Sequence, residues 1–289
     1  MNQRLMKTST ILLISCPDTR GIVAGISDFI FRHNGNILHA DEHADEESNL
    51  FLMRVEFDAR DFDIDLSDFS RHFSPVAEKF GMRWSLARSD YRPRMIILVS
   101  KYDHCLVDLL YRHSSGELAC DIPLIISNHP DNQPIADFYR VPFVVVEVTK
   151  DNKSEAESKI LELVTRHNAD FMVLARYMQI LSQEFVSQFP QRIINIHHSF
   201  LPAFVGARPY HQAFTRGVKL IGATSHYVTE ALDDGPIIEQ DVVRISHRDA
   251  MEDLLKKGRD LEKVVLSRAV RWHIENRILL YKNKTVVFD

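Results

Sequence analysis

From residue 94 onward, unbroken apolar runs alternate with segments of helical periodicity, and this alternation constrains the fold more than any other feature. The apolar runs are rich in Val and Ile, and in chain order they are RMIILVS, IPLIISN, FVVVEV, FMVLA and RIINIHH. The helical patterns between them are HCLVDLLYRH and SEAESKILELVTRH. Strands that are apolar on both faces are typical of a parallel sheet that helices cover on both sides. We therefore expect an open, mostly parallel, Rossmann-like α/β domain over residues 94–289.

The first 88 residues show a different order of patterns. The strand candidate STILLISC is followed by a helical pattern that ends at Asn34 and Gly35, and then by two strand candidates, NILHADEHAD and NLFLMRVEF. A second helical pattern runs from Leu66 to Phe80, and the strand candidate MRWSLA comes after it. The order βαββαβ predicts a ferredoxin-like domain over residues 1–88. The polar segment 89–93, which ends in proline, is the predicted linker.

Composition and charge exclude several classes of protein. Hydrophobic residues make up 45% of the chain and charged residues 26%, which is the balance of a folded globular protein. The net charge of −5 comes from the first 90 residues, with 10 Lys and Arg against 15 Asp and Glu, so the larger part is neutral and lacks the basic face that nucleic acids require. No apolar run reaches the roughly 18 residues of a membrane span. We expect a cytoplasmic protein with a small-molecule partner, and the three scattered cysteines fit a reducing compartment.

Two clusters of polar side chains lie next to apolar strand candidates, one at the end of a strand and the other just ahead of one. Ligands bind near strand ends in open α/β sheets. The first is NIHHSFLPAFVG, in which Asn195 and His197 are two residues apart and so share one face of a strand. The second is GATSHYVTEALDDGPIIEQ, which begins 27 residues after Asn195 and contains His226, Asp233 and Asp234. A carboxamide and an imidazole can stabilise an oxyanion, and a carboxylate can accept a proton, so the set is suited to acyl transfer.

Each of these residues taken alone has a simpler structural explanation. Asn195 can be a loop residue, and His198 and His226 can be hydrogen-bonded structural histidines. Asp234 is typical of the turn before a Gly-Pro pair. A zinc site made by His197, His198 and His226 is a further alternative, but no HxxxH helix or Cys ligand accompanies it, and we expect no metal. The combination of the residues, and not any single one, indicates chemistry.

The two strings, with their spacing, closely resemble the formyltransferase fold of enzymes that use 10-formyltetrahydrofolate, such as glycinamide ribonucleotide formyltransferase. The resemblance implies that the catalytic Asn, His and Asp of these enzymes are Asn195, His197 and Asp233 here. It places the folate slot around YMQILS and VTEALD. The substrate-binding residues that it implies are Met178, Gln179, Leu181, His226 and Thr229. The transferases commonly have Arg where this chain has Gln179.

The acceptor side differs from that of the nucleotide-using transferases. Those enzymes have a Gly-rich loop that holds the acceptor phosphate, whereas the segment VSKYDHCL of this chain contains no glycine. With SKYDHCL, RWHIENRILLYKNKTVVF and CPDTRGI, the chain resembles the formyltetrahydrofolate deformylase family over essentially its whole length. His104 and Cys105 either close the former acceptor pocket or, for Cys105, form the buried start of a helix.

The resemblance implies a hydrolase that acts on a linear amide C–N bond. Its products would be formate, which supplies purine synthesis, and tetrahydrofolate, so the reaction would balance one-carbon folate pools, and no cofactor is required. Two alternatives stay open: a formyltransferase with an amine acceptor, and an inactive, amino-acid-responsive folate-binding protein. The intact set of Asn195, His197 and Asp233 argues against the second.

The N-terminal domain resembles an ACT domain, a regulatory module that often binds an amino acid. The resemblance implies a site at Asp18, Gly21 and Ile22, where the N–H groups of a helix can bind a carboxylate and Asp18 can face an ammonium group. Glycine and methionine are the effectors that we expect first. The alternative is that Asp18 is only a turn residue and that the module builds an oligomer. We expect a homo-oligomer.

Overall fold

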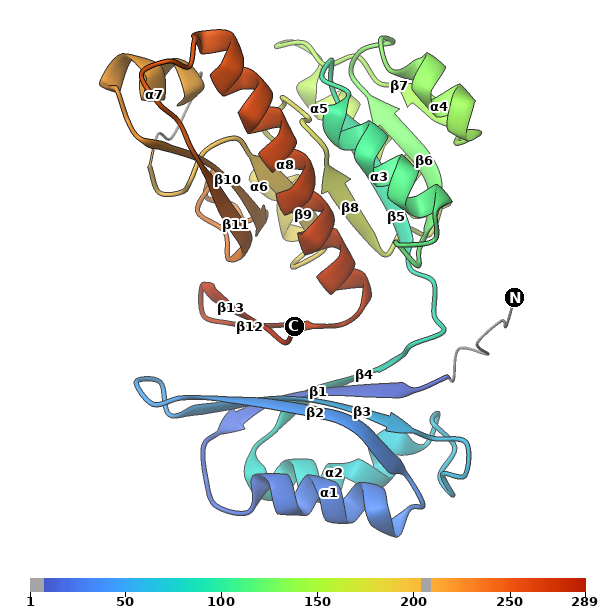
Figure 1. Ribbon diagram of the computed structural model, residues 1–289. Coiled ribbons are helices and arrows are strands. Elements are labelled where there is room, and N and C mark those ends of the chain that lie inside the picture. Colours follow the sequence, from blue (N-terminus) through green and yellow to red (C-terminus); the bar gives the residue numbers. More distant parts are fainter. Residues whose placement is uncertain (1–7, 204–208) are drawn as a thin grey trace, which may run out of the picture. The chain divides into compact units, whose positions relative to one another are not determined.

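The computed structural model describes residues 8–203 and 209–289, which form two units. The larger unit comprises residues 92–274 and 282–284 and is built on one mixed sheet (Figure 1). Its strands within the described residues are β5 (Arg94–Val99), β6 (Asp121–Ser127), β7 (Phe143–Val145), β8 (Phe171–Leu174), β9 (Ile193–His197), β10 (Leu220–Tyr227) and β11 (Ile237–Arg244). Across the sheet they lie in the order β11-β10-β9-β8-β5-β6-β7.

This sheet is mostly parallel, as the sequence predicts. Strands β7, β6, β5, β8 and β9 pair in parallel, and their central members are buried on both faces. The pairs β9–β10 and β10–β11 are antiparallel, which the sequence patterns do not show. Strand β7 is shorter than the apolar run FVVVEV, because its last residue, Val145, pairs with Ser127, the last residue of the neighbouring strand β6.

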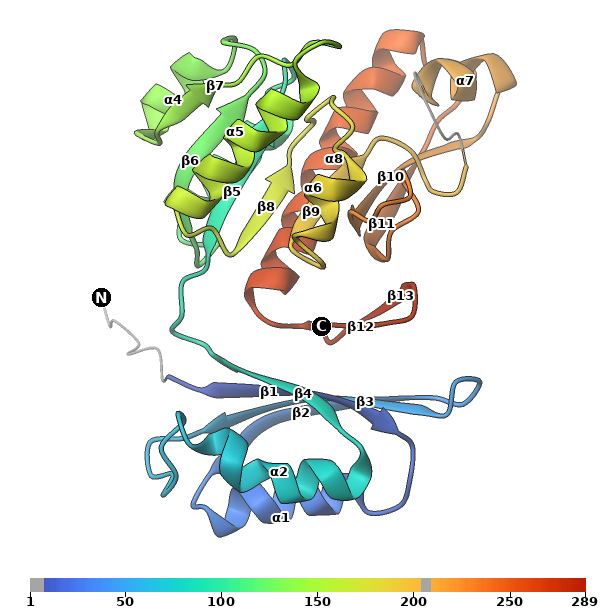
Figure 2. The same cartoon turned by 180° about the vertical axis from the view of Figure 1, so that it is seen from behind.

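Helices cover both faces of the sheet. They are α3 (His104–Ser114), α4 (Gln133–Tyr139), α5 (Lys153–Arg166), α6 (Gln183–Ser187), α7 (Pro209–Arg216) and α8 (Met251–Ile274). Figure 1 shows α3 and α8 over one face, and Figure 2 shows α5 and α6 over the other. In α5 the buried residues Ala156, Ile160, Leu163 and Val164 recur every three or four positions, so one stripe of the helix packs on the strands. None of the helices described is long and apolar enough to cross a membrane.

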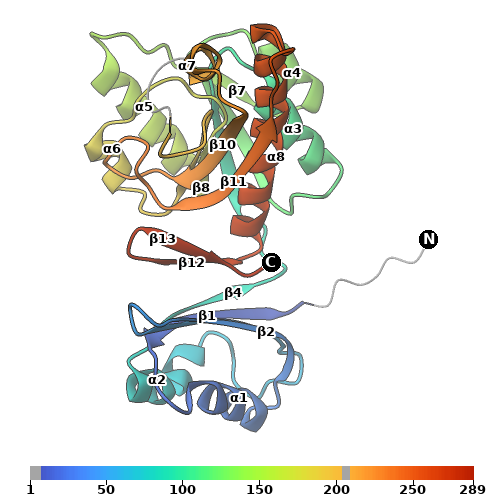
Figure 3. The ribbon, with the colours of Figure 1, turned by 60° about the vertical axis from the view of Figure 1, so that its left-hand side comes forward.

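The smaller unit contains a four-stranded antiparallel sheet with two helices on one face, as Figure 3 shows. In chain order its elements are β1 (Thr10–Pro17), α1 (Ile22–Arg32), β2 (Asn36–Asp45), β3 (Leu50–Asp58), α2 (Phe69–Phe80) and β4 (Arg83–Arg88). The strands lie in the order β2-β3-β1-β4. Buried Phe29, Phe69 and Phe73 bring the two helices together with ring centroids 5.1–5.5 Å apart. Each buried aromatic ring removes a large apolar area from water, so this cluster is the main core of the unit.

The end of the chain belongs to the smaller unit. The sequence patterns instead placed all residues from 94 to 289 in one domain. The unit includes residues 275–281 and 285–289 in addition to the residues up to Tyr91. The buried Arg54 side chain explains this, because it donates to the carbonyl oxygens of Asn276 at 3.1 Å and Glu275 at 3.4 Å. The segment contains the hairpin of β12 (Ile278–Tyr281) and β13 (Lys284–Val287). The predicted linker 89–93 lies between β4 and β5.

Candidate active site

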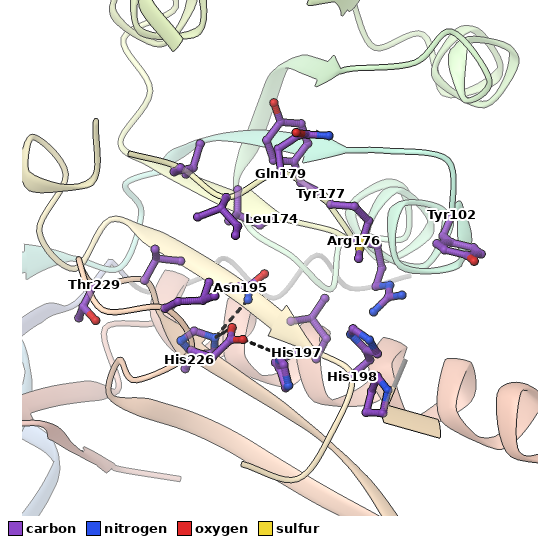
Figure 4. A pocket seen from close by; sticks show the side chains of 18 of the residues that line it. Tyr102, Leu174, Arg176, Tyr177, Gln179, Asn195, His197, His198, His226 and Thr229 are labelled. Atoms are coloured by element: carbon purple, nitrogen blue, oxygen red, sulfur yellow. Dashed lines mark hydrogen bonds and ion pairs between the residues drawn. The ribbon is translucent and has the colours of Figure 1, made fainter. Parts of the chain in front are cut away.

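The antiparallel pairing of β9 with β10 sets the geometry of the site. In this ladder Asn195 lies directly opposite His226, and His197 lies opposite Thr224. Residues that face each other, or that are two apart on a strand, direct their side chains to the same face of a sheet. Asn195, His197 and His226 therefore gather on one face, as Figure 4 shows.

Hydrogen bonds hold Asn195 and His226 in a defined orientation. Nδ1 of His226 lies 3.0 Å from the carbonyl oxygen of Tyr227, which can only accept, so this nitrogen carries the proton. Burial lowers the pKa of His226 and outweighs the hydrogen bond to that carbonyl and the charge of Asp233, so the neutral ring is favoured. Nε2 then accepts a hydrogen bond from Asn195 Nδ2 at 3.1 Å. One amide N–H of Asn195 is used in this bond, and the second stays available for a ligand.

Asp233 completes the group from the loop between β10 and β11. Its Oδ2 lies 3.3 Å from Nδ1 of His197, and its Oδ1 lies 3.8 Å from Nε2 of His226. Burial alone raises the pKa of this carboxyl, but the hydrogen bond and charge of His197 outweigh it, so the pKa is lowered and the group is ionised at neutral pH. Asp233 has φ 55°, a left-handed conformation that non-glycine residues adopt rarely and often at functional sites.

The neighbouring residues explain why Asp233, and not Asp234, reaches the histidines. Asp234 is exposed, and its backbone carbonyl accepts a hydrogen bond from Asn283 at 2.8 Å. Gly235 is buried against β10, where a Cβ atom would lie 1.8 Å from the carbonyl oxygen of Tyr227. Only glycine fits there, and this close approach fixes the loop that carries Asp233.

His197 keeps one ring nitrogen for a ligand. The residue is 5% exposed, and its Nε2 is buried with no hydrogen-bond partner among the described residues. Because Nδ1 faces Asp233, Nε2 is on the opposite side of the ring. An unpartnered buried polar atom is costly, so it indicates a position that a bound molecule satisfies.

A cavity of about 530 Å³ surrounds these side chains. Asn195, His197, His226 and Asp233 line it, and apolar residues such as Leu174 and Val228 contribute to its wall. The residues that the folate resemblance implies also line it: Met178, Gln179, Leu181 and Thr229. The structure therefore brings every predicted catalytic and substrate-binding residue to one cavity. The last residues of the string NIHHSFLPAFVG, from 204 onward, lie outside the described part of the chain.

A second cluster of polar side chains lies at the same cavity. Of its members, the sequence predictions name only His104. Arg176 and Tyr210 line the cavity, and Glu262 of α8 is 1% exposed. Glu262 accepts hydrogen bonds from Tyr210 Oη at 2.6 Å and pairs with His104 Nε2 at 2.8 Å, and its Oε2 is 3.4 Å from Arg176 Nε. Burial raises the pKa of Glu262, but His104 and Arg176 outweigh that effect and the pKa is lowered.

The sequence carried signals for two of these residues. Arg176 is the second residue after β8, at the carboxyl end of a parallel strand, where polar residues indicate a ligand site. Glu262 stands among the buried residues Gly258, Leu261 and Leu266 of α8, so it is a charged residue on the apolar stripe of a helix.

The described residues contain one cluster with the ligand types of a metal site. His104, Cys105 and Glu262 each offer one ligand atom, and these atoms lie within 4.8 Å of one another. Burial raises the pKa of the Cys105 thiol well above its usual value, so it is a poor ligand, and the guanidinium of Arg176 already faces Glu262. The cluster is therefore better suited to hold the Arg176 side chain than a metal ion. Cys105 is buried near the start of α3, one of the two roles that the sequence leaves open.

The residues of the predicted amino-acid site lie at the turn between β1 and α1. Asp18 and Gly21 are exposed, and Ile22 is the buried first residue of α1. Gly21 has φ 91°, which favours glycine, and no side chain caps the helix. The N–H group of Asp18 is bonded to the carbonyl oxygen of Asn49 at 3.0 Å.

Comparison with known proteins gives consistent relatives for the whole chain. Residues 93–270 match the formyl transferase family. The formyltetrahydrofolate deformylase of Synechocystis sp. is 55% identical over 98% of this chain and 100% of that protein, and the one of Bacillus subtilis is 49% identical over 96% and 93%. The crystal structure of a formyltetrahydrofolate deformylase from Pseudomonas syringae has a TM-score of 0.96 at 50% identity, covering 99% of this chain and 96% of that one. A glycinamide ribonucleotide transformylase from Symbiobacterium toebii has a TM-score of 0.65 at 28% identity, covering 68% and 95%.

Proposed function

The chain belongs to the formyltetrahydrofolate deformylase family, whose members are hydrolases, and we propose that it hydrolyses 10-formyltetrahydrofolate at the cavity around Asn195, His197 and Asp233. The observation that carries the proposal is the arrangement of these side chains. A carboxylate, an imidazole with a free nitrogen and a carboxamide with a free N–H converge on one cavity.

The proposed reaction begins with a water molecule beside the formyl carbon. Asp233 positions this water and accepts its proton while the new C–O bond forms. Asn195 donates a hydrogen bond to the oxyanion of the tetrahedral intermediate, and so does Nε2 of His197 in its imidazolium form, with Nδ1–H donating to Asp233. The intermediate then collapses, the C–N10 bond breaks, and the proton held by Asp233 is returned to N10. The products are tetrahydrofolate and formic acid, which releases one proton to solvent and becomes formate, so atoms and charges balance without a cofactor.

His226 has a positioning role in this scheme. Its fixed tautomer accepts from Asn195, which fixes the direction of the second amide N–H. Preorganised donors stabilise a transition state better than mobile ones, because no reorganisation is needed as charge develops. The folate ring system is proposed to occupy the part of the cavity formed by Met178, Gln179, Leu181 and Thr229.

We propose water as the acceptor of the formyl group because the segment before α3 lacks the glycine-rich loop that holds the acceptor phosphate in the nucleotide-using transferases. The segment before α3 has no glycine, and His104 at the start of α3 is paired with Glu262. The nucleotide-using transferases hold the acceptor phosphate with a glycine-rich backbone loop, which this segment lacks. The function of a formyltransferase therefore has less support.

One assay tests the function. The purified protein is incubated with 10-formyltetrahydrofolate, with and without glycinamide ribonucleotide, and formate and formylated nucleotide are both measured. We expect equimolar formate and tetrahydrofolate, unchanged by the nucleotide. Formyl transfer to the nucleotide at a rate similar to formate release would show a transferase.

We further propose that the smaller unit is a ferredoxin-like, ACT-type regulatory domain. The support is its antiparallel sheet order, the two helices on one face and the uncapped start of α1 beside Asp18, Gly21 and Ile22. Glycine or methionine is the proposed effector, and the domain is proposed to act within a homo-oligomer. The whole protein is proposed to be cytoplasmic and to supply formate for purine synthesis.

A further inference from the structure

Arg176 is a buried cation that the proposed hydrolysis does not use. It is the second residue after β8 and has φ 63°, an uncommon left-handed conformation for a residue with a Cβ atom. Its carbonyl oxygen accepts from the N–H of Ser100 at 3.3 Å, which ties the turn to the end of β5. The side chain is 9% exposed and lines the cavity of the active site.

The environment of Arg176 fixes the guanidinium but leaves donors unused. The guanidinium stacks on Tyr102, with Cζ 5.3 Å from the ring centroid, and Nε lies 3.4 Å from Oε2 of Glu262. This second contact is an ion pair without hydrogen-bond geometry, since Nε and Nη1 of Arg176 are buried and have no hydrogen-bond partner within residues 8–203 and 209–289. Glu262 is already engaged by Tyr210 and His104. Buried N–H donors of this kind are costly to leave unpaired.

The guanidinium lies on the side of the cavity where His198 and His197 are neighbours. Figure 4 shows the Arg176 side chain extending toward His198, whose ring centroid is 5.3 Å from that of His197. Burial and then the charge of Arg176 lower the pKa of His198 to about 3, so His198 is neutral at physiological pH. Arg176 is thus a fixed positive charge beside His198, which is the neighbour of the catalytic His197.

We propose that Arg176 forms a subsite for the small carboxylate product, formate, next to Asn195, His197 and Asp233. This inference rests on the proposed function, which makes formate. Collapse of the tetrahedral intermediate leaves formic acid, which releases its proton to solvent and becomes a planar anion. The terminal Nη1 and Nη2 groups of a guanidinium offer two parallel N–H donors to such an anion, and the geometry is specific to carboxylates and similar groups. The neutral formyl group of the substrate gains much less from this charge, so the subsite selects the product.

The test measures formate binding without folate. ¹³C-labelled formate is titrated with the full-length protein, and its NMR relaxation gives the affinity for the wild type and three variants. Arg176→Gln removes the positive charge. Arg176→Lys keeps the charge that faces Glu262 but loses the planar guanidinium with its parallel N–H donors. Arg259→Gln is the matched control. Arg259 also stacks on Tyr102, at 5.7 Å, but it is exposed and does not line the cavity.

We expect the wild type and Arg259→Gln to bind formate equally, and Arg176→Gln to bind roughly 10- to 100-fold more weakly, as for loss of hydrogen bonds to a charged group. Arg176→Lys should lie between them, and it keeps the test valid if Arg176→Gln does not fold. Equal binding by the Arg176 variants, or none by the wild type, would overturn the subsite. Hydrolysis by a wild type that does not bind formate would refute this inference alone, whereas formate binding without hydrolysis would refute the proposed function alone.

Discussion

Asn195 and His226 face each other across the β9–β10 ladder, with Asn195 Nδ2 3.1 Å from His226 Nε2. The contact links two strands that are 31 residues apart in the sequence, and it turns the carboxamide toward the cavity. The bond depends on the tautomer that the Tyr227 carbonyl selects. The oxyanion donor is therefore positioned by a residue that need not touch the substrate.

Replacing His226 tests this positioning role. His226→Gln should lower kcat by roughly 10- to 100-fold with a much smaller change in KM, because the Asn195 donor acts mainly in the transition state. His247→Gln, an exposed histidine after β11, should leave both parameters unchanged. Steady-state kinetics of formate release provide the measurement. A change in KM with an unaltered kcat would show that His226 serves binding instead.

Removing the Asn195 donor should have a larger effect. Asn195→Ala should lower kcat by about 10²- to 10³-fold, as for other oxyanion donors. Combined with Asp233→Asn, the loss should be much smaller than the product of the two single losses, since both groups act on one transition state. Fully multiplicative losses in single-turnover kinetics would mean that the two residues act independently.

The buried carboxylate of Glu262 should be important for stability. Glu262→Gln leaves Arg176 without its ionic partner and should lower the free energy of unfolding at pH 7 by about 3–5 kcal/mol. The folded-state pKa of Glu262 is lowered, so its contribution is fully present above the ordinary value near 4.5 and is lost as the pH falls through the folded-state value. The difference in thermal unfolding between wild type and variant should therefore shrink below that pH.

The surface pair of Glu162 with Arg166 supplies the control for this experiment. Both side chains are more than half exposed. Glu162→Gln should cost less than about 1 kcal/mol, because solvent screens such pairs. Equal effects of the Glu162 and Glu262 substitutions would contradict the role assigned to the buried carboxylate.

Amino-acid binding tests the proposed regulatory site. Calorimetry on the intact protein should show binding of glycine or methionine that Asp18→Asn weakens by roughly tenfold, because the ammonium group loses an ionic partner. Asp28→Asn is the matched control, since Asp28 is exposed on α1 and pairs with Arg32 at 2.9 Å. If neither amino acid binds, the unit has a structural role.

Local patterns predicted the parts of the fold that depend on local order. The alternation of apolar strands and helical periods indicated the mostly parallel sheet, and β2 and β3 begin and end close to the predicted positions. The antiparallel strands β10 and β11 depend on long-range pairing, which no short window contains. The place of residues 275–281 depends on Arg54, more than 200 positions away.

The site was predictable to the extent that its residues lie in contiguous motifs. Asn195, His197 and Asp233 belong to two strings with a specific spacing, and they meet in one cavity. The pairing of Asn195 with His226 requires the strand register. Arg176, Glu262 and Tyr210 come from three distant segments, so only the folded chain shows that they form one group.

The choice between the adjacent carboxylates Asp233 and Asp234 gives the most direct test of the proposed hydrolysis. Formate release from 10-formyltetrahydrofolate is measured for Asp233→Asn and Asp234→Asn, both of which keep the size of the side chain. Asp233→Asn should lower turnover by roughly 10²- to 10⁴-fold through loss of the base, with folate affinity much less affected. Asp234→Asn should be nearly unchanged, because that residue is exposed and contacts neither His197 nor His226. An inactive Asp234→Asn beside an active Asp233→Asn, or full activity of both folded variants, would contradict the account.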